Sequence, residues 1–165
     1  MPAGLLRKLL MLALIALNVA CDQWSKDYVR RNVQPESYTE LAGPSFILTR
    51  VENTGAFLGL GQAWGPWAKR ILLNGIPIAL LVYLGYRILF KPEWKGLMLM
   101  GLCCIVGGGL GNLYDRLMLG SVTDFFQLRA GPLHTGIFNM ADLSVSLGLG
   151  LVLLAYTRSR KKEEA

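Results

Sequence analysis

Residues 96–116 read GLMLMGLCCIVGGGLGNLYDR, and charged side chains occur only at the last two positions. A helix needs about 20 mostly apolar residues to cross the hydrocarbon core of a bilayer. The polar end of the stretch repeats every four residues, at Gly108, Asn112 and Arg116, so these positions share one face of a helix. The stretch therefore predicts a membrane-spanning helix over about 96–113 that ends in a polar face.

Further apolar stretches of similar length lie at about 5–24, 71–90 and 137–156. The second contains Asn74 and Pro77, which membrane helices tolerate where neighbours satisfy the freed backbone groups. The chain has 165 residues, of which 53% are hydrophobic and 17% are charged, and the charges gather at the ends of the apolar stretches. We expect one membrane domain over 1–165, an all-α membrane protein with four transmembrane helices.

Lysine and arginine near the ends of the spans predict the orientation of the chain. With four spans, both termini and the connection at 91–95 lie on one side, and basic residues are densest there. We therefore expect both termini in the cytoplasm, including a tail at 157–165, and outer loops at 25–70 and 114–136. The basic residues on the expected cytoplasmic side are Arg7, Lys8, Arg87, Lys91, Lys95, Arg158, Arg160, Lys161 and Lys162.

The longer outer loop contains a segment with the character of a β-strand. The sequence SFILTRVENTGAF at 45–57 is rich in β-branched and aromatic residues and follows a Gly43-Pro44 pair. We expect a small extracytoplasmic β-rich loop region that lies on the membrane surface.

The first span ends in LNVACDQWSK at 17–26, which is similar to the box where lipoprotein precursors are cut before a cysteine. Asn18 stands where a leucine is usual in such a box. Three more spans also follow, whereas a lipoprotein would continue as a soluble body. We therefore expect the first span to be retained rather than removed before Cys21.

Cysteine and histidine do not form a metal-binding pattern in this sequence. Cys103 and Cys104 are adjacent inside an apolar stretch, and His134 is the only histidine. We expect no metal and no cofactor. The formal net charge is +6, but the basic residues form no stripe interleaved with aromatic residues, so nucleic-acid binding is not expected.

Several polar residues lie near the outer ends of the spans. An ionisable side chain at the centre of the bilayer costs about 2.5–3.5 kcal/mol on insertion scales, so each one needs a reason. Asp22 and Lys26 are four residues apart and could form a simple ion pair at a helix end, and Asn139 could simply cap the fourth span. Such structural roles do not explain Asp142, one turn into that span, or Asp124 within the apolar sequence VTDFF.

Two carboxyl groups at the boundary between water and lipid can share one proton, because burial and mutual repulsion raise the pKa of one of them. The charged acid can then activate a water molecule while the neutral acid protonates a peptide carbonyl, as in aspartic proteases. Residue types alone leave this hydrolysis and an ion or proton translocation equally open. A third alternative is a membrane scaffold, in which the spacing of Gly107 and Gly111 serves only helix packing.

Five motifs resemble, in order along nearly the whole chain, those of the lipoprotein signal peptidase family, also called signal peptidase II or prolipoprotein signal peptidase. The sequence reads NTGAF where members of this family often read NTGAAF. The motifs are DQWSK at 22–26, NTGAF at 53–57, GGGLGNLYDR at 107–116, VTDFF at 122–126 and FNMAD at 138–142.

The resemblance implies an aspartic endopeptidase, a hydrolase of the bacterial cytoplasmic (inner) membrane with its active site at the outer face. It implies that the enzyme cleaves diacylglyceryl-modified prolipoproteins before the lipidated cysteine, with Asp124 and Asp142 as the catalytic pair and an activated water. Membrane lipid and globomycin-type cyclic peptide inhibitors are the other implied partners. The implied substrate-binding or supporting residues are Asp22, Lys26, Asn53, Gly55, Gly108, Asn112, Arg116 and Asn139.

Overall fold

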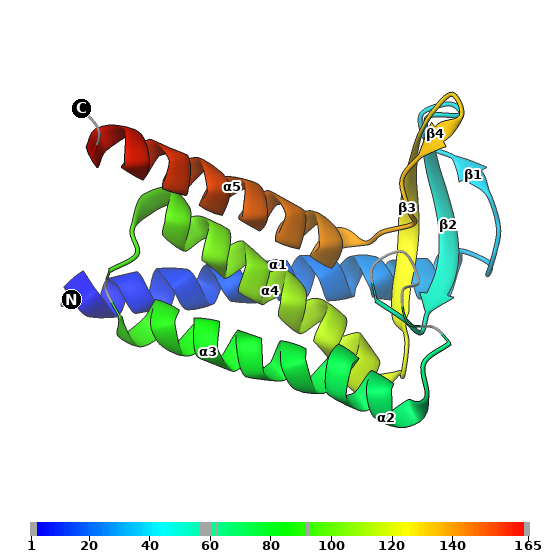
Figure 1. Cartoon of the computed structure of the whole chain (residues 1–165). Helices are drawn as coiled ribbons and strands as arrows, with labels where there is room; N and C mark the ends of the chain where they lie inside the picture. Colours follow the sequence, from blue (N-terminus) through cyan, green and yellow to red (C-terminus); the bar gives the residue numbers. More distant parts are fainter. Residues whose placement is uncertain (1–2, 57–60, 62, 92, 164–165) are drawn as a thin grey trace.

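The structure is a computed structural model that describes residues 3–56, 61, 63–91 and 93–163. Long helices lie side by side, a small sheet stands across one end of them, and both termini lie at the other end (Figure 1). The elements in chain order are α1 (Ala3–Asn32), β1 (Thr39–Glu40), β2 (Phe46–Asn53), α2 (Pro66–Lys69), the π-helix η2 (Arg70–Gly75), α3 (Ile76–Phe90), α4 (Gly96–Met118), β3 (Val122–Ala130), β4 (Leu133–His134) and α5 (Met140–Glu163).

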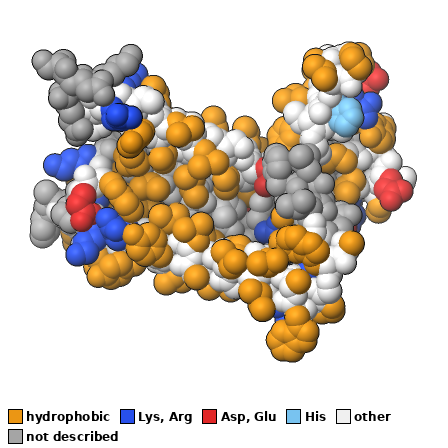
Figure 2. All heavy atoms as spheres, in the orientation of Figure 1, with side chains coloured by type: hydrophobic (Ala, Val, Ile, Leu, Met, Phe, Trp, Pro, Cys, Tyr) orange, Lys and Arg blue, Asp and Glu red, His pale blue; other side chains and the backbone are white. Residues whose placement is uncertain are grey.

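Within the described residues, four helical segments are long and apolar enough to cross a membrane. They are Gly4–Asn32, Pro66–Phe90, Gly96–Met118 and Met140–Arg160. Large hydrophobic side chains on the outer surfaces of these segments are exposed. Leu10, Val82 and Leu153 are each more than half exposed. Figure 2 shows hydrophobic side chains over the flanks of the helices, as expected for surfaces that face lipid.

The helices differ from the apolar stretches mainly at their ends. Helix α1 continues through the polar residues beyond 24 to Asn32, so the expected outer loop at 25–70 begins as helix. Helix α5 begins at Met140 rather than at 137, because the residues before it are extended and Phe138 forms a β-bridge with Phe126. Hydropathy follows the environment of a segment, whereas a helix ends where its backbone hydrogen bonds end.

The second membrane-spanning segment changes its helix type near Pro77. Its first part is α2, a π-helical stretch follows over Arg70–Gly75, and α3 continues to Phe90. Proline has no N–H to donate to the preceding turn, and a local π-helical stretch is one way to absorb such an interruption.

Helix α4 lies against α1, α3 and α5 and occupies the centre of the bundle. Its three consecutive glycines each face a different neighbour. A Cβ atom at Gly107 would lie 2.6 Å from Cβ of Asn18 in α1, one at Gly108 would lie 2.9 Å from Val145 in α5, and one at Gly109 would lie 2.7 Å from Leu81 in α3. The absence of side chains at these positions therefore allows all three helices to approach α4.

The sheet is antiparallel, with the strand order β1-β2-β3-β4. The strand-like segment 45–57 supplies β2, and its last residue, Phe57, lies outside the described residues. Strand β3 follows α4 after a turn at Gly120, where φ is 79°. The register of β2 with β3 pairs Val51 with Asp124. The expected combination of four apolar helices and a small β-rich region is confirmed, while the side of the membrane on which each end lies stays a prediction.

Candidate active site

Polar side chains from α1, α4, β2, β3 and the start of α5 meet where the helices reach the sheet. Asp124 on β3 is buried, with 4% of its surface exposed. Its Oδ2 accepts a hydrogen bond from Asn53 Nδ2 at 3.0 Å, and its Oδ1 accepts one from Asn139 Nδ2 at 2.6 Å. This carboxyl group is therefore held between the end of β2 and the beginning of α5.

Asp142 is fixed by the start of the helix that carries it. Asn139 caps α5, because its Oδ1 accepts a hydrogen bond from the backbone N–H of Asp142 at 3.0 Å. The backbone N–H of Asn139 donates in return to Oδ2 of Asp142 at 3.3 Å, which makes a reciprocal capping box. Asp142 Oδ1 accepts a further hydrogen bond from Asn112 Nδ2 on α4 at 2.8 Å.

Both acids line the same small cavity. Its volume is about 10 Å³, which is close to what one water molecule requires. Asn139 bridges the walls of this cavity, because its Nδ2 also lies 3.1 Å from Asn112 Oδ1. The cavity is lined by Asn53, Ala56, Asn112, Arg116, Val122, Asp124, Ile137 and Asp142.

The surroundings of Asp124 raise its pKa to about 7, mainly because burial penalises the charged carboxylate. The nearby negative charge of Asp142 adds to this rise, while the hydrogen bonds from Asn53 and Asn139 and the positive charge of Lys26 oppose it. At neutral pH Asp124 is therefore present in both the protonated and the charged form.

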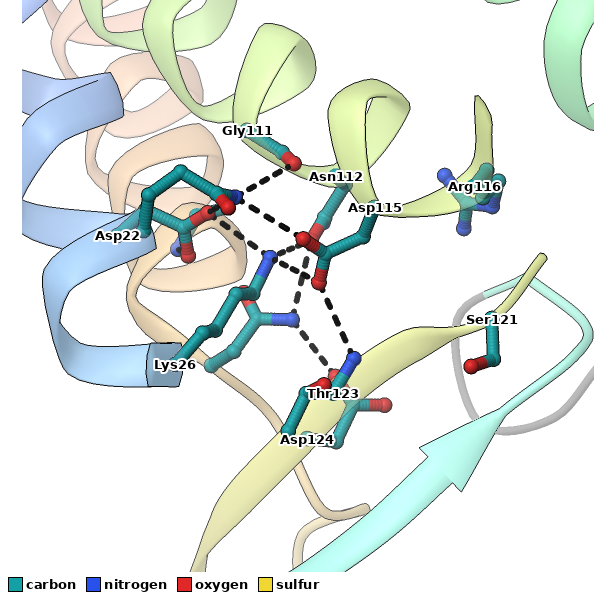
Figure 3. A network of polar contacts seen from close by, with 12 residues as sticks. Asp22, Lys26, Gly111, Asn112, Asp115, Arg116, Ser121, Thr123 and Asp124 are labelled. Atoms are coloured by element: carbon teal, nitrogen blue, oxygen red, sulfur yellow. Dashed lines mark hydrogen bonds and ion pairs between the residues drawn. The ribbon is translucent and has the colours of Figure 1, made fainter. Parts of the chain in front are cut away.

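A buried network of charges lies behind the cavity and joins α1 to α4 (Figure 3). Lys26 Nζ lies 2.8 Å from Asp22 Oδ2, 3.2 Å from Asp115 Oδ2 and 2.8 Å from Asn112 Oδ1. The side chains of Lys26, Asp22 and Asp115 are fully buried. Asp115 also accepts a hydrogen bond from Arg30 Nη2 at 3.0 Å. The network is electrically balanced, with two carboxylates and two cations.

Arg116 connects the end of α4 to the segment after β2. Its Nη2 donates to the carbonyl oxygen of Gly55 at 3.2 Å, and Gly55 N donates to Asn53 Oδ1 at 2.9 Å. Arg116 Nε is buried and has no hydrogen-bond partner among the described residues. Arg116 is also one of the residues that line the cavity.

The structure brings together all of the residues expected from the sequence except Gly108. Gly108 lies deeper in the bundle, where a Cβ atom would overlap the carbonyl oxygen of Ala141 in α5. The sequence indicates Asp115 only as a charged residue beside the polar face at 108, 112 and 116, with no role, and sequence reasoning missed Arg30, Gln23 and Thr123 as members of the buried network. A usable signal was present, because Arg30 continues the spacing of four that Asp22 and Lys26 begin.

A second, larger cavity opens beside Asp142, with a volume of about 200 Å³. It lies where α5 meets the segment before it, on the side where Figure 2 shows a hollow between the helices and the raised end of the sheet. Its lining is mostly apolar, so it suits a hydrophobic group next to the acids. The lining residues are Thr135, Gly136, Phe138, Asp142, Leu143 and Ser146.

The fold and the site define a multi-pass membrane protein with a pair of acids at one end of its helices. The model of the family described as Signal peptidase (SPase) II matches residues 14–158. The chain belongs to the signal peptidase II family, and membership in it makes the chain a protease. The resemblance seen in the sequence motifs is therefore confirmed, and between hydrolysis and ion translocation the family favours hydrolysis.

Curated relatives cover most of the chain. A lipoprotein signal peptidase of Moorella thermoacetica is 38% identical over 85% of this chain and 86% of its own length. A lipoprotein signal peptidase of Pasteurella multocida is 33% identical over 92% of this chain and 90% of its own length.

Solved structures agree with the fold. A bacterial membrane enzyme determined by the in meso method at 2.3 Å resolution has a TM-score of 0.81, with 24% identity, over 92% of this chain and 90% of that chain. A second bacterial membrane enzyme, at 1.9 Å resolution, has a TM-score of 0.74 and 23% identity over 88% of this chain and 91% of that chain.

Proposed function

We propose that this chain is an aspartic endopeptidase that removes the signal peptide from diacylglyceryl-modified prolipoproteins by cleaving before the lipidated cysteine. The observation that carries the proposal is that Asp124 and Asp142 line one cavity with room for about one water molecule. Membership in the signal peptidase II family supports a signal peptide as the part that is removed.

In this reaction, Asp142 acts as the base and Asp124 as the acid. Asp142 takes a proton from the water, whose oxygen attacks the scissile carbonyl carbon, while protonated Asp124 gives its proton to the carbonyl oxygen. As the resulting tetrahedral diol collapses and the C–N bond breaks, charged Asp124 takes back a proton from a diol hydroxyl and protonated Asp142 gives its proton to the leaving nitrogen. The raised pKa of Asp124, about 7, supports this assignment, because that group keeps a proton close to neutral pH.

The polar neighbours divide into two roles. Asn53, Asn112 and Asn139 donate hydrogen bonds to the two acids and so hold them in place. Arg116 lines the cavity and carries a positive charge there, so we assign it to the binding of a substrate carbonyl.

The substrate has to present an extended segment to the acids, because the carbonyl groups of a helix are hydrogen-bonded and covered. The sheet beside the cavity offers strand edges with which such a segment could pair. The apolar cavity beside Asp142 suits the diacylglyceryl group or a lipid. Globomycin-type cyclic peptides are expected to occupy the same groove and to inhibit.

We place the enzyme in the bacterial cytoplasmic membrane, with both termini in the cytoplasm and the acids at the outer face. The termini lie at the end of the bundle opposite the sheet, which fits this orientation (Figure 1). The dense basic residues at the terminal end support the same direction through the positive-inside rule.

Cleavage of two matched precursors tests the function. Purified protein in detergent is incubated with a precursor that carries the diacylglyceryl group and with the same precursor without it. We expect a product whose new N-terminus is the lipidated cysteine, identified by mass spectrometry, and much slower cleavage of the unmodified precursor. Equal rates for both precursors, or cleavage at another bond, would contradict the proposal.

A further inference from the structure

All three N–H donors of the Lys26 ammonium group have partners inside the protein. An ammonium group has three donors and no acceptor. Its nitrogen lies within hydrogen-bonding distance of Asp22, Asp115 and Asn112 (Figure 3). The two carboxylates hold the ammonium group in place, and its remaining N–H is directed at Asn112 Oδ1.

The direction of the Asn112 amide is set by its contacts on both sides, and Lys26 makes one of them. Asn112 Oδ1 accepts from Lys26 Nζ at 2.8 Å and from Asn139 Nδ2 at 3.1 Å. Its Nδ2 therefore faces Asp142 Oδ1, at 2.8 Å. A rotation of the amide by half a turn would set an NH₂ group against an ammonium group and an oxygen against a carboxylate, which is unfavourable on both sides.

We infer that Lys26 is a positioning residue that holds Asn112 so that its amide donates to Asp142. The inference rests on the proposed function, in which Asp142 is the base. Helix α1 makes a second link to the same acid, because Asp22 Oδ1 accepts from the backbone N–H of Ala141 at 2.9 Å. The ion pair of α1 thus acts on the side chain of Asp142 through Asn112 and on its backbone through Ala141.

The two α1 residues stand behind the cavity rather than in it. The side chains of Asp22 and Lys26 are fully buried, and neither lines the cavity that contains the acids. Their loss should leave KM unchanged and lower kcat by about 10- to 100-fold, because small displacements of a reacting group cost rates of this order.

The test variant has to fold. Replacing Lys26 alone would leave Asp22 and Asp115 buried with only Arg30 as a cation. The double variant Asp22→Asn with Lys26→Met keeps the cluster neutral, because Asp115 retains Arg30 at 3.0 Å. An asparagine oxygen at position 22 can still accept from Ala141. The variant also loses the contact of Lys26 with Asp115 and that of Gln23 with Asp22, so its effect has to be compared with and without Asn112.

Ser144→Ala is the matched control. Ser144 Oγ donates to Asn18 Oδ1 and lies 3.0 Å from the carbonyl oxygen of Cys104, so it joins α1, α4 and α5 away from the acids. Both variants lose buried contacts between the same helices. We expect a drop in kcat only in the double variant, with unfolding measured for each protein in the same detergent.

The decisive measurement compares the rate loss caused by the double variant in the presence and in the absence of the Asn112 side chain. The double variant is also made in an Asn112→Ala background and measured by single-turnover cleavage of lipidated precursor, where we expect no further loss of rate. A wild-type kcat in the double variant, an equal loss in both backgrounds, or the same loss in Ser144→Ala would overturn the inference.

The variant Asp142→Asn separates this inference from the proposed function. If Asp142→Asn keeps its turnover, the proposed function itself fails. If that variant is inactive while the double variant is fully active, only the role of Lys26 fails.

Discussion

Asn139 Nδ2 lies 2.6 Å from Asp124 Oδ1 and thereby ties strand β3 to the start of helix α5. The same side chain accepts the backbone N–H of Asp142 through its Oδ1. Asn139 is fully buried. One amide group therefore sets the positions of two acids that belong to different elements.

Replacing Asn139 by alanine should lower kcat about 100-fold or more, because both acids lose a hydrogen bond that fixes them. It should also lower the free energy of unfolding by about 1–3 kcal/mol, since buried partners are left unsatisfied. Cleavage kinetics and chemical unfolding in detergent measure both effects. Asn32→Ala is the control, because the Asn32 amide makes only an exposed contact to Tyr28 within its own helix. Similar kinetics for the two variants would rule out this role.

The stability of the protein should depend on pH through Asp124. Its pKa is about 7 in the folded protein, against an ordinary aspartate value of 3.8. Between these values the folded state holds a proton that the unfolded state has lost, so the free energy of unfolding is highest below about pH 4, falls as the pH rises toward 7 and does not change further through this group above that.

Through this group, the free energy of unfolding should fall by about 1.4 kcal/mol for each pH unit between about pH 4 and pH 7. An Asp124→Asn variant should lack that slope, whatever its absolute stability. Unfolding of both proteins across this range, with Asp142, Lys26 and Arg116 retained, measures the difference. Parallel pH profiles would show that the environment of Asp124 does not raise its pKa.

Helix α4 should tolerate no side chain at Gly108. A Cβ atom there would meet Ala141 and lie 2.9 Å from Val145, so Gly108→Val must push α5 and Asp142 away. We expect a loss of thermal stability and of kcat. Gly85→Ala in α3 is the control, because nothing lies within 4 Å of a Cβ atom at that position, and alanine favours helix. Equal stability of the two variants would contradict the packing described for α4.

Local geometry explains which parts of the site were predictable from sequence. The spacing of Asp22 and Lys26 predicts a shared helical face, and the structure places them 2.8 Å apart. The role of Asn139 as a cap was also predictable, because caps depend on neighbours along the chain. The strand-like composition of residues 45–57 likewise indicated β2.

Contacts set by tertiary packing were not predictable. The hydrogen bond between Asn53 and Asp124 depends on the register of β2 with β3, which no single segment encodes. Asp115 joins α1 to the start of β3 only because α4 continues as a helix beyond the expected end at 113. Helices α1 and α5 also differ at their ends from the apolar stretches, since hydropathy does not report where a helix stops.

The measurement that tests the account most directly is cleavage of a diacylglyceryl-modified precursor by the wild-type protein and by the variants Asp124→Asn and Asp142→Asn. Each variant removes one ionisable oxygen while keeping the size of the side chain. The account predicts normal turnover by the wild-type protein and none by either variant, with all three proteins folded in detergent. Turnover near the wild-type rate in either variant would show that the two acids do not activate the water together.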